Sequence, residues 1–350
     1  MKLFSQHTNM PSTRAGLFGS NCSIDQASLV VIPAPWEVTV STRSGTALGP
    51  ETILRASYQL NAYVPAHTHT SPLNIAMLPI PHDWKILGDT LRHDAASYIH
   101  TLELGIQAPM LPKSILQKIH SSTRLFQEEL KKKALGHLNK NKVVAVLGGE
   151  HSVALGLLEA LAEKHEHFGI LHINAHAALH KAYQGFTYSH ASLMYNALKF
   201  PQIEKVVQIG LRDYSKEEEQ VITSSKGRIV AFLDDQLQAD RFRGIKWDTS
   251  CKKIIDALPE QVYISFDIDG LEPSLCPSTG TPVPGGLSFD EVCYLFKCMV
   301  AAGKKVIGFD LCEVAPGEHL DWDAQVGSRM LYQLAVTAVA SQNKGACIAE

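Results

Sequence analysis

Short apolar runs rich in β-branched residues recur along the chain, separated by stretches whose apolar residues have helical spacing. Each run is mostly apolar on both faces, as expected for a strand that is covered on both sides. The runs are Ser28–Ile32, Leu73–Leu78, Lys142–Leu147, Phe168–Ile173, Lys205–Ile209, Arg228–Leu233, Gln261–Phe266 and Lys304–Phe309. The helical stretches are Pro50–Leu60, Pro112–Leu135, Ser152–Lys164, Ser215–Ser224, Ser288–Ala302 and Asp323–Ala340. This alternation predicts a single three-layer α/β/α domain with a parallel sheet of about eight strands.

The predicted domain spans residues 28–350, and residues 1–27 are expected to form an N-terminal arm or tail. The region from Pro65 to Gly88, outside its one short strand, is rich in Pro and His and is expected to be irregular. No apolar stretch reaches the ~18 residues that a membrane span needs, and Met1–Asn21 lacks the apolar core of a signal peptide. We therefore expect a cytoplasmic protein without a membrane partner.

The composition is that of a globular protein, with 45% hydrophobic and 19% charged residues. Lys and Arg number 32 against 35 Asp and Glu, and no basic run is longer than Lys131–Lys133. Because nucleic-acid binding needs a basic surface, we expect no nucleic-acid partner and instead a small molecule. The 7 Cys have no regular spacing, which favours reduced thiols over a disulfide framework.

Polar residues with metal-binding chemistry follow several predicted strands, at the sheet edge where open parallel sheets bind ligands. His151 follows the third strand, His176 the fourth, and Asp267-Ile268-Asp269 the seventh, while the eighth runs into Asp310–Glu313. Two His and two Asp from three strand ends have the composition of a metal site. Taken singly, each piece is also typical of a tight turn, a packed histidine or an ordinary loop, but their joint placement favours a site.

The same motifs carry a family resemblance over about residues 28–340. They are Pro35–Glu37, Arg43–Thr46, Gly49-Pro50 with Arg55, Gly148–Ser152, Tyr188–Ala191, Ser265–Pro273, Pro277–Gly286 and Asp310–Pro316. Together they resemble the ureohydrolases, the family of arginase, agmatinase, formimidoylglutamase and guanidino-acid hydrolases. The resemblance implies an arginase-like fold with an eight-stranded parallel sheet, hydrolysis of a guanidino C–N bond, and a homo-oligomer, commonly a trimer or hexamer.

The resemblance also implies a pair of Mn²⁺ ions at the strand ends. By this resemblance, the metal ligands in this chain include His151, His176, Asp267 and Asp269. A family motif that should read Asp-Ala-His-x-Asp reads here Asn174-Ala175-His176-Ala177-Ala178. A bridging carboxylate has thus become an amide, expected to be a weak ligand through its oxygen, and another ligand has become a methyl group.

These two departures change the charge of the expected site. Two divalent ions would lack half of the carboxylates that balance them in the family pattern, and uncompensated charge in a partly desolvated site is costly. We therefore expect at most one strong manganese site, built from His176, Asp267 and Asp269. His172 and His180 lie four residues to either side of His176, but we interpret them as a buried polar residue and a solvated loop residue.

Two further residues are carried over as catalytic and substrate-binding. Glu313 matches the carboxylate that pairs with a guanidinium, and His190 matches a histidine that shuttles protons or holds the substrate. Asp267 is counted as catalytic because it would ligate the ion. The segment Tyr183–His190 resembles the agmatinase branch, so agmatine-like substrates come first and other guanidino or formimino compounds follow.

The sequence therefore predicts an agmatinase-like hydrolase that converts agmatine to putrescine and urea, with weakened or altered metal-dependent activity. The alternative is an inactive protein of the same fold that binds a guanidinium or polyamine, or serves as a regulatory subunit. Asn174 and Ala178 favour the inactive protein, whereas Glu313, His190 and the paired aspartates favour the enzyme. A third reading is that the two positions were altered on purpose to trap a substrate.

Overall fold

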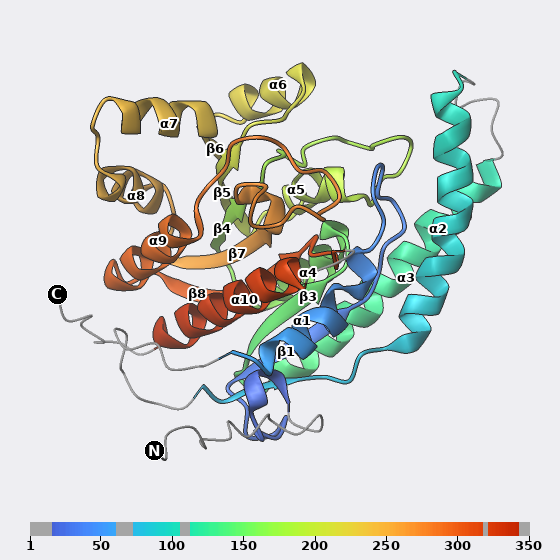
Figure 1. The fold of residues 1–350 in the computed structure, drawn as a ribbon, viewed down its shortest axis with the longest axis horizontal. Coiled ribbons are helices and arrows are strands. Elements are labelled where there is room, and N and C mark those ends of the chain that lie inside the picture. The colour runs from blue at the N-terminus through green and yellow to red at the C-terminus, as the bar shows by residue number, and fades with distance from the viewer. Residues whose placement is uncertain (1–15, 61–72, 106–112, 318–320, 343–350) are drawn as a thin grey trace, which may run out of the picture.

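A computed structural model of the chain describes residues 16–60, 73–105, 113–317 and 321–342 (Figure 1). Its centre is an 8-stranded sheet with the order β2-β1-β3-β8-β7-β4-β5-β6, in which every neighbouring pair is parallel. The strands are β1 (Leu29–Ala34), β2 (Ile75–Met77), β3 (Val143–Gly148), β4 (Phe168–Ile173), β5 (Ile203–Leu211), β6 (Ile229–Leu233), β7 (Gln261–Asp267) and β8 (Lys305–Cys312). All eight strands predicted from the apolar runs are confirmed, and so is the α/β fold class.

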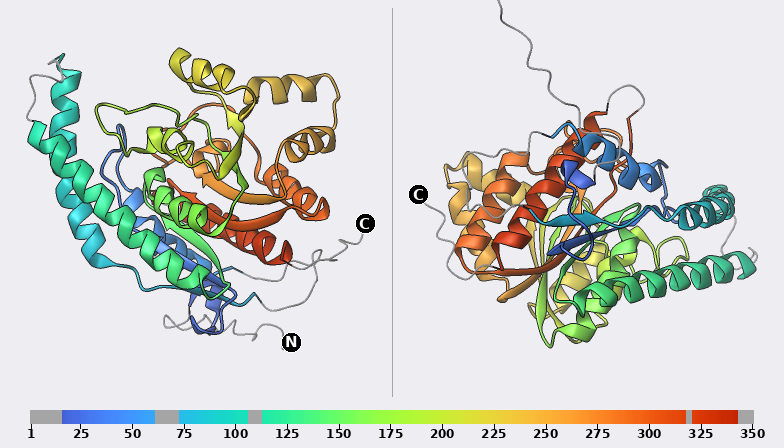
Figure 2. Two further views of the ribbon diagram at one scale, coloured as in Figure 1. Left: turned by 180° about the vertical axis from the view of Figure 1, so that it is seen from behind. Right: turned by 90° about the horizontal axis from the view of Figure 1, so that it is seen from below.

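Helices cover both faces of this sheet. They are α1 (Gly49–Ser57), α2 (His82–Glu103), α3 (Lys113–Leu138), α4 (Ala154–Lys164), α5 (Leu193–Ala197), α6 (Lys216–Ser224), α7 (Asp234–Phe242), α8 (Trp247–Asp256), α9 (Phe289–Ala301) and α10 (Trp322–Ala340). Helices α1, α8, α9 and α10 pack on one face, and α3, α4 and α5 on the other (Figure 2). No helix within these described ranges is long and apolar enough to cross a membrane.

The central strands are buried on both faces. In β3, Val144 and Val146 join the core beneath α3 and α4, while Ala145 and Leu147 join the core beneath α1 and α10. Successive side chains of a strand point to opposite faces, so an uninterrupted apolar run supplies both cores at once. This burial explains why the strands appear in the sequence as short continuous apolar runs rather than as alternating ones.

Helix α2 corrects one prediction. The chain is helical from His82 onward, where the sequence favoured an irregular crossing up to Gly88. Helices α2 and α3 lie side by side and extend beyond the edge of the sheet (Figure 1). Because α2 projects from the sheet, only a narrow stripe of its side chains is buried. One position of that stripe is Gly88, which lies close to Trp36 and adds no apolar side chain. The helical spacing of apolar residues is therefore weak in this part of the sequence.

Part of the predicted N-terminal arm packs against the domain. Leu17 is fully buried, and the Phe18 amide donates to Ser57 Oγ at 3.1 Å. The Lys142 ammonium donates to the backbone oxygens of Asp25 and Ala27, both at 2.8 Å. Residues 1–15 lie outside the described part of the chain, so an arm or tail ending at residue 27 stays a prediction.

The turn after β3 depends on the absence of a side chain at Gly149. A Cβ atom there would stand 2.1 Å from the Trp36 carbonyl oxygen and 2.7 Å from that of Ala34. Both are backbone atoms of the segment that begins with β1, which cannot move away as a flexible side chain can. The close approach brings Glu150 and His151 to the sheet edge.

We predict that Gly149→Ala lowers the free energy of unfolding by about 3 kcal/mol or more, because overpacking against backbone cannot relax. Gly136→Ala is the matched control. Gly136 lies in α3 with nothing within 4 Å of its Cβ position, so Gly136→Ala should raise the free energy of unfolding by roughly 0.5–1 kcal/mol. Urea denaturation of both variants measures the difference, and equal stabilities would contradict the close-approach account.

Candidate functional site

A cavity of about 640 Å³ opens at the carboxyl ends of the central strands. Strands β3, β8, β7 and β4 are neighbours in the sheet, and they bring the predicted site residues to one edge. The cavity is lined by Asn174, His176, His190, Asp267, Asp269 and Glu313, among others. His151 lies beneath this lining and is fully buried. The structure thus gathers all the residues that the sequence placed in the site.

On one side of the site, His176 and Asp269 form an ion pair. His176 Nδ1 lies 2.9 Å from Asp269 Oδ2, and the Ala175 amide donates to Asp269 Oδ1 at 2.9 Å. Burial alone would lower the pKa of His176, but its contact with Asp269 raises that pKa to about 9. Burial likewise opposes ionisation of Asp269, but the bond from His176 outweighs it and holds the pKa of Asp269 below its usual value.

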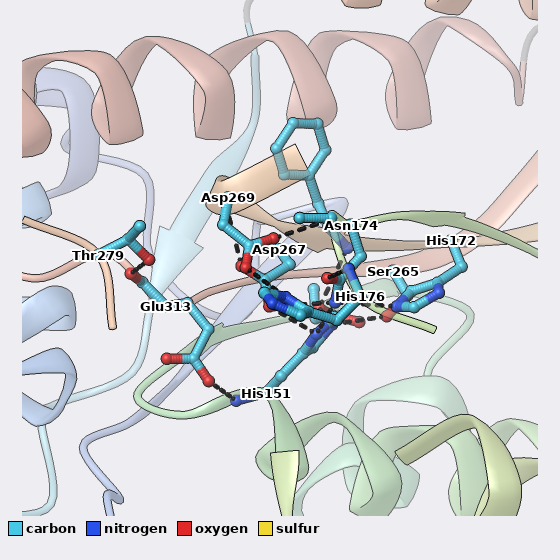
Figure 3. A network of polar contacts seen from close by, with 12 residues as sticks. His151, His172, Asn174, His176, Ser265, Asp267, Asp269, Thr279 and Glu313 are labelled. Carbon is cyan, nitrogen blue, oxygen red and sulfur yellow. Dashed lines mark hydrogen bonds and ion pairs between the residues drawn. The ribbon is translucent and has the colours of Figure 1, made fainter. Parts of the chain in front are cut away.

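On the other side, His151 connects two buried carboxylates, of which Asp267 is labelled in Figure 3. Its Nδ1 lies 3.1 Å from Asp267 Oδ2, and its Nε2 lies 3.1 Å from Asp310 Oδ1 and 2.9 Å from Ser265 Oγ. Burial lowers the pKa of His151, yet the charges of Asp310 and Asp267 together hold it well above its usual value. The His151 amide also donates to Glu313 Oε1 at 2.7 Å. Each aspartate of the Asp-x-Asp motif therefore faces an imidazole.

Asn174 lies between these two pairs, and its orientation is defined by the backbone. Its Oδ1 accepts the His176 amide at 2.6 Å, so the other end of the group is the NH₂. That nitrogen lies 3.1 Å from Asp267 Oδ2, 3.1 Å from His151 Nδ1 and 3.2 Å from His172 Nε2. The oxygen expected to be a weak metal ligand is therefore turned to the backbone, and the amide hydrogens point toward the ligand atoms.

The flanking histidines behave as expected. His172 is fully buried, its Nδ1 lies 3.0 Å from Gln208 Nε2, and burial lowers its pKa well below the usual value. His180 is partly exposed and its Nε2 lies 3.2 Å from Glu218 Oε2. Neither side chain replaces the carboxylates missing at positions 174 and 178.

One group of potential metal ligands lies together among the described residues. It consists of His151, Asp310 and Cys312, whose ligand atoms all lie within 4.8 Å of one another. The Asp310 carboxylate in this group already accepts from Tyr263 Oη at 2.7 Å and from the Phe266 amide at 3.2 Å, and burial raises the pKa of the Cys312 thiol well above its usual value. We interpret the group as a buried hydrogen-bond network.

The single site expected at His176 and Asp269 stays a prediction. Their facing atoms are 2.9 Å apart, which is the distance of their ion pair. Asp267 is the adjoining carboxylate, since its Oδ1 accepts the Asp269 amide at 3.0 Å. These are the three residues that the sequence assigned to the one strong site.

The two residues assigned to the substrate both line the cavity. Burial lowers the pKa of His190 to about 4, so its imidazole is neutral near pH 7. Its Nδ1 has no hydrogen-bond partner among the described residues. For Glu313, burial and the charge of Asp267 raise the pKa well above the usual value. A cation bound at Glu313 would favour the ionised carboxylate again.

The loop that carries the agmatinase-like segment is held by α2 and α3. Phe186 is fully buried, with its ring 5.6 Å from that of Tyr98 in α2, and the Thr187 amide donates to His120 Nε2 of α3 at 3.1 Å. Tyr183, earlier in the loop, lines the cavity and packs edge-on against His190. The projecting helices therefore help to shape the site, which the sequence did not reveal.

The sequence also missed the wall of the cavity after β5. Asp213, Tyr214, Ser215 and Glu218 line it, and Asp213 Oδ2 lies 3.6 Å from His176 Nε2. The available signal was position, because these residues directly follow a predicted strand. The strand-end rule that selected the third, fourth, seventh and eighth strands also applies to the fifth.

We predict at most one tightly held divalent ion per chain. Elemental analysis of the protein after loading with manganese and dialysis measures the ratio. Two ions per chain would show that the cluster accommodates the second charge despite the missing carboxylates.

Glu150 directly precedes His151 in the chain, and its carboxyl group is fully buried. Its Oε2 accepts from the Thr39 amide at 2.8 Å and from Thr39 Oγ1 at 3.0 Å, and its Oε1 accepts from Ser152 Oγ at 2.7 Å. Burial raises the pKa of Glu150 from 4.5 to about 7. The folded protein therefore retains a proton that the unfolded chain loses, and this contribution to stability disappears as the pH rises from about 4.5 through about 7.

We predict that Glu150→Gln weakens this pH dependence. A neutral amide keeps the hydrogen bonds without titrating, so relative to the variant the wild type should lose about 3 kcal/mol between pH 4 and pH 8. Urea denaturation at several pH values measures the slope. Glu166→Gln, at an exposed position, controls for the loss of one charge. Parallel curves for wild type and Glu150→Gln would show that Glu150 does not titrate in this window.

Comparison with known proteins identifies the family. The family model "Arginase family" matches residues 27–339. The chain is 33% identical over 294 residues to an N(1)-aminopropylagmatine ureohydrolase of Thermus thermophilus, covering 83% of this chain and 84% of the relative, and 28% identical over 312 residues to an agmatinase of Neisseria meningitidis, covering 88% and 86%. The solved structure of an agmatine ureohydrolase of Thermoplasma volcanium has the same fold, with a TM-score of 0.71, 20% identity and 98% coverage of both chains. The chain belongs to the arginase family.

Proposed function

We propose that this protein is an agmatinase-like hydrolase of a guanidino C–N bond whose metal-dependent activity is weakened by Asn174 and Ala178. One observation carries the proposal: Glu313, His190 and the Asp267–Asp269 pair face one cavity in a chain of the arginase family. The reaction class is the one in the names of its relatives, a ureohydrolase and an agmatinase. The homo-oligomer and the cytoplasmic location stay predictions.

The charge of the cavity supports a cationic substrate. Five carboxyl groups line it, from Asp213, Glu218, Asp267, Asp269 and Glu313, whereas the cationic side chains among the described lining residues are Arg43 and the ion-paired His176. The Arg43 guanidinium already donates to the Pro277 carbonyl oxygen at 3.0 Å. An acidic cavity attracts a guanidinium with a second amine and repels a carboxylate tail. Agmatine-like compounds therefore rank above guanidino acids.

Each residue around the cavity would have a separate role in hydrolysis. Glu313 would receive the guanidinium through charge-assisted hydrogen bonds, and the neutral His190 would hold or accept a proton at Nδ1. His176, Asp267 and Asp269 would hold one divalent ion. When bound, such an ion supplies a water of lowered pKa as the nucleophile. Hydrolysis would form a C–O bond between water and the guanidinium carbon and break the C–N bond to the amine. The amine nitrogen would take up the protons of the water, and urea and the amine would leave.

The second candidate is a guanidinium- or polyamine-binding protein without turnover, and the Asn174 amide favours it. Urea release from agmatine, arginine and guanidino acids, assayed with manganese, separates the two. If the protein is a hydrolase, we expect slow release of urea from agmatine. No urea from any substrate, together with no retained metal, would overturn the hydrolase and leave the binding protein.

We predict that Glu313→Gln weakens agmatine binding by ~1.5–3 kcal/mol, the usual contribution of a hydrogen bond to an ionised group. Isothermal titration calorimetry of the two proteins measures the difference. Glu272→Gln is the matched control, since Glu272 follows the same Asp-x-Asp motif but is exposed. Equal affinities for wild type and Glu313→Gln would show that Glu313 does not face the ligand.

We predict that Asn174→Asp combined with Ala178→Asp raises both metal content and urea-forming activity, and that either change alone does less. The two carboxylates enter one cluster, so their effects should be non-additive. The backbone is suited to the change: Ala178 has φ 53°, a left-handed conformation that Asp tolerates better than Ala, and its carbonyl oxygen accepts from the Met194 amide. Metal analysis and urea assays of the three variants measure it. No gain in metal by the double variant would contradict this prediction.

A further inference from the structure

The Asn174 amide makes contacts that a carboxylate at the same position could not make. A carboxylate only accepts hydrogen bonds, whereas the Asn174 NH₂ donates. It donates to Asp267 Oδ2 at 3.1 Å and lies 3.2 Å from His172 Nε2. Asn174 is 3% exposed and Asp267 4% exposed, so protein atoms supply most of their contacts.

The same amide group also orders the backbone of the loop after β4. Its Oδ1 accepts the His176 amide at 2.6 Å, while the neighbouring Ala175 amide donates to Asp269 Oδ1. One side chain thus connects the Asp267–His151 side of the cluster to the turn that positions His176. Figure 3 shows Asn174 between these residues, at the centre of the network.

A shared ion would act in the same way, because it presents positive charge to several buried ligand atoms at once. A buried carboxylate without a positive or donating partner is costly. The polarised N–H groups of Asn174 supply such a partner to Asp267 without adding an ion. Replacing the amide by a carboxylate would remove that donor and set a third negative charge beside Asp267 and Asp269.

From these contacts we infer that the Asn174 amide replaces the ion on the His151 side as the group that holds this buried cluster together. Asn174 is a positioning residue: it fixes Asp267 and the loop before His176. The folded pocket therefore assembles without an ion on that side. This inference goes beyond the proposed hydrolysis, and its test does not use urea release.

Thermal unfolding of the full chain, in chelator and in excess manganese, tests the inference. Asn174→Asp should lower the Tm in chelator by roughly 5 °C or more relative to wild type, and manganese should restore most of that loss. Manganese should raise the Tm of the wild type by much less. An ion bound at His176 would contribute equally to both proteins, so the larger rise in Asn174→Asp would come from an ion on the His151 side.

Two further variants keep the result unambiguous. Asn196→Asp is the matched control: Asn196 is also buried, and its NH₂ donates to the Thr187 and Ser192 carbonyl oxygens at 2.8 and 2.9 Å, away from the cluster. It should lose stability without recovery by manganese. Asn174→Ala, which adds no charge, should lower the Tm equally in chelator and in manganese, and it decides the case if Asn174→Asp does not fold.

Three outcomes would overturn the inference. The first is Asn174→Asp melting at the wild-type temperature in chelator, and the second is Asn174→Ala melting at that temperature as well. The third is an equal rise in Tm with manganese for wild type and Asn174→Asp, because the wild-type cluster would then depend on the ion as much as the variant does.

Discussion

Two aspartates are buried side by side at the end of β7, and the rest of the site is arranged around the need to compensate them. Asp267 and Asp269 are 4% and 3% exposed. A buried carboxylate persists only with a positive or donating partner. Each therefore faces an imidazole, from His151 or His176, and each accepts a backbone amide. Burial and the neighbouring charge of Asp269 still raise the pKa of Asp267, which is why the additional donor from Asn174 matters on that side.

The parallel sheet supplies these partners because its four central strands end at the same edge. His151 follows β3, Asn174 and His176 follow β4, and Glu313 follows β8. Burial on both faces fixes the strands, so the side chains at their ends have little freedom to adjust. Changes at positions 174 and 178 therefore alter the charge of the cluster without requiring the strands to move. Under the proposed function, this is how a chain of the arginase family would keep a cavity for a guanidinium without the carboxylates that two ions need.

The strands and most long helices could be predicted from the sequence, because a strand buried on both faces appears as a short apolar run. Helix α2 could not, since it buries only a narrow stripe and begins after the Pro-rich region. The identity of the site residues came from motifs at strand ends, but their mutual orientation did not. No pattern in the sequence shows that the Asn174 oxygen turns to the His176 amide, because that depends on the loop conformation. The same holds for Asp310, whose role as the partner of His151 requires the register of β3 with β8.

The most direct test is a crystal structure of the wild-type protein grown with manganese and measured at the manganese absorption edge. The account predicts at most one anomalous peak, beside His176 and Asp269, with the Asn174 nitrogen within hydrogen-bond distance of Asp267. A peak between His151 and Asp267, with the Asn174 oxygen turned toward it, would contradict the account.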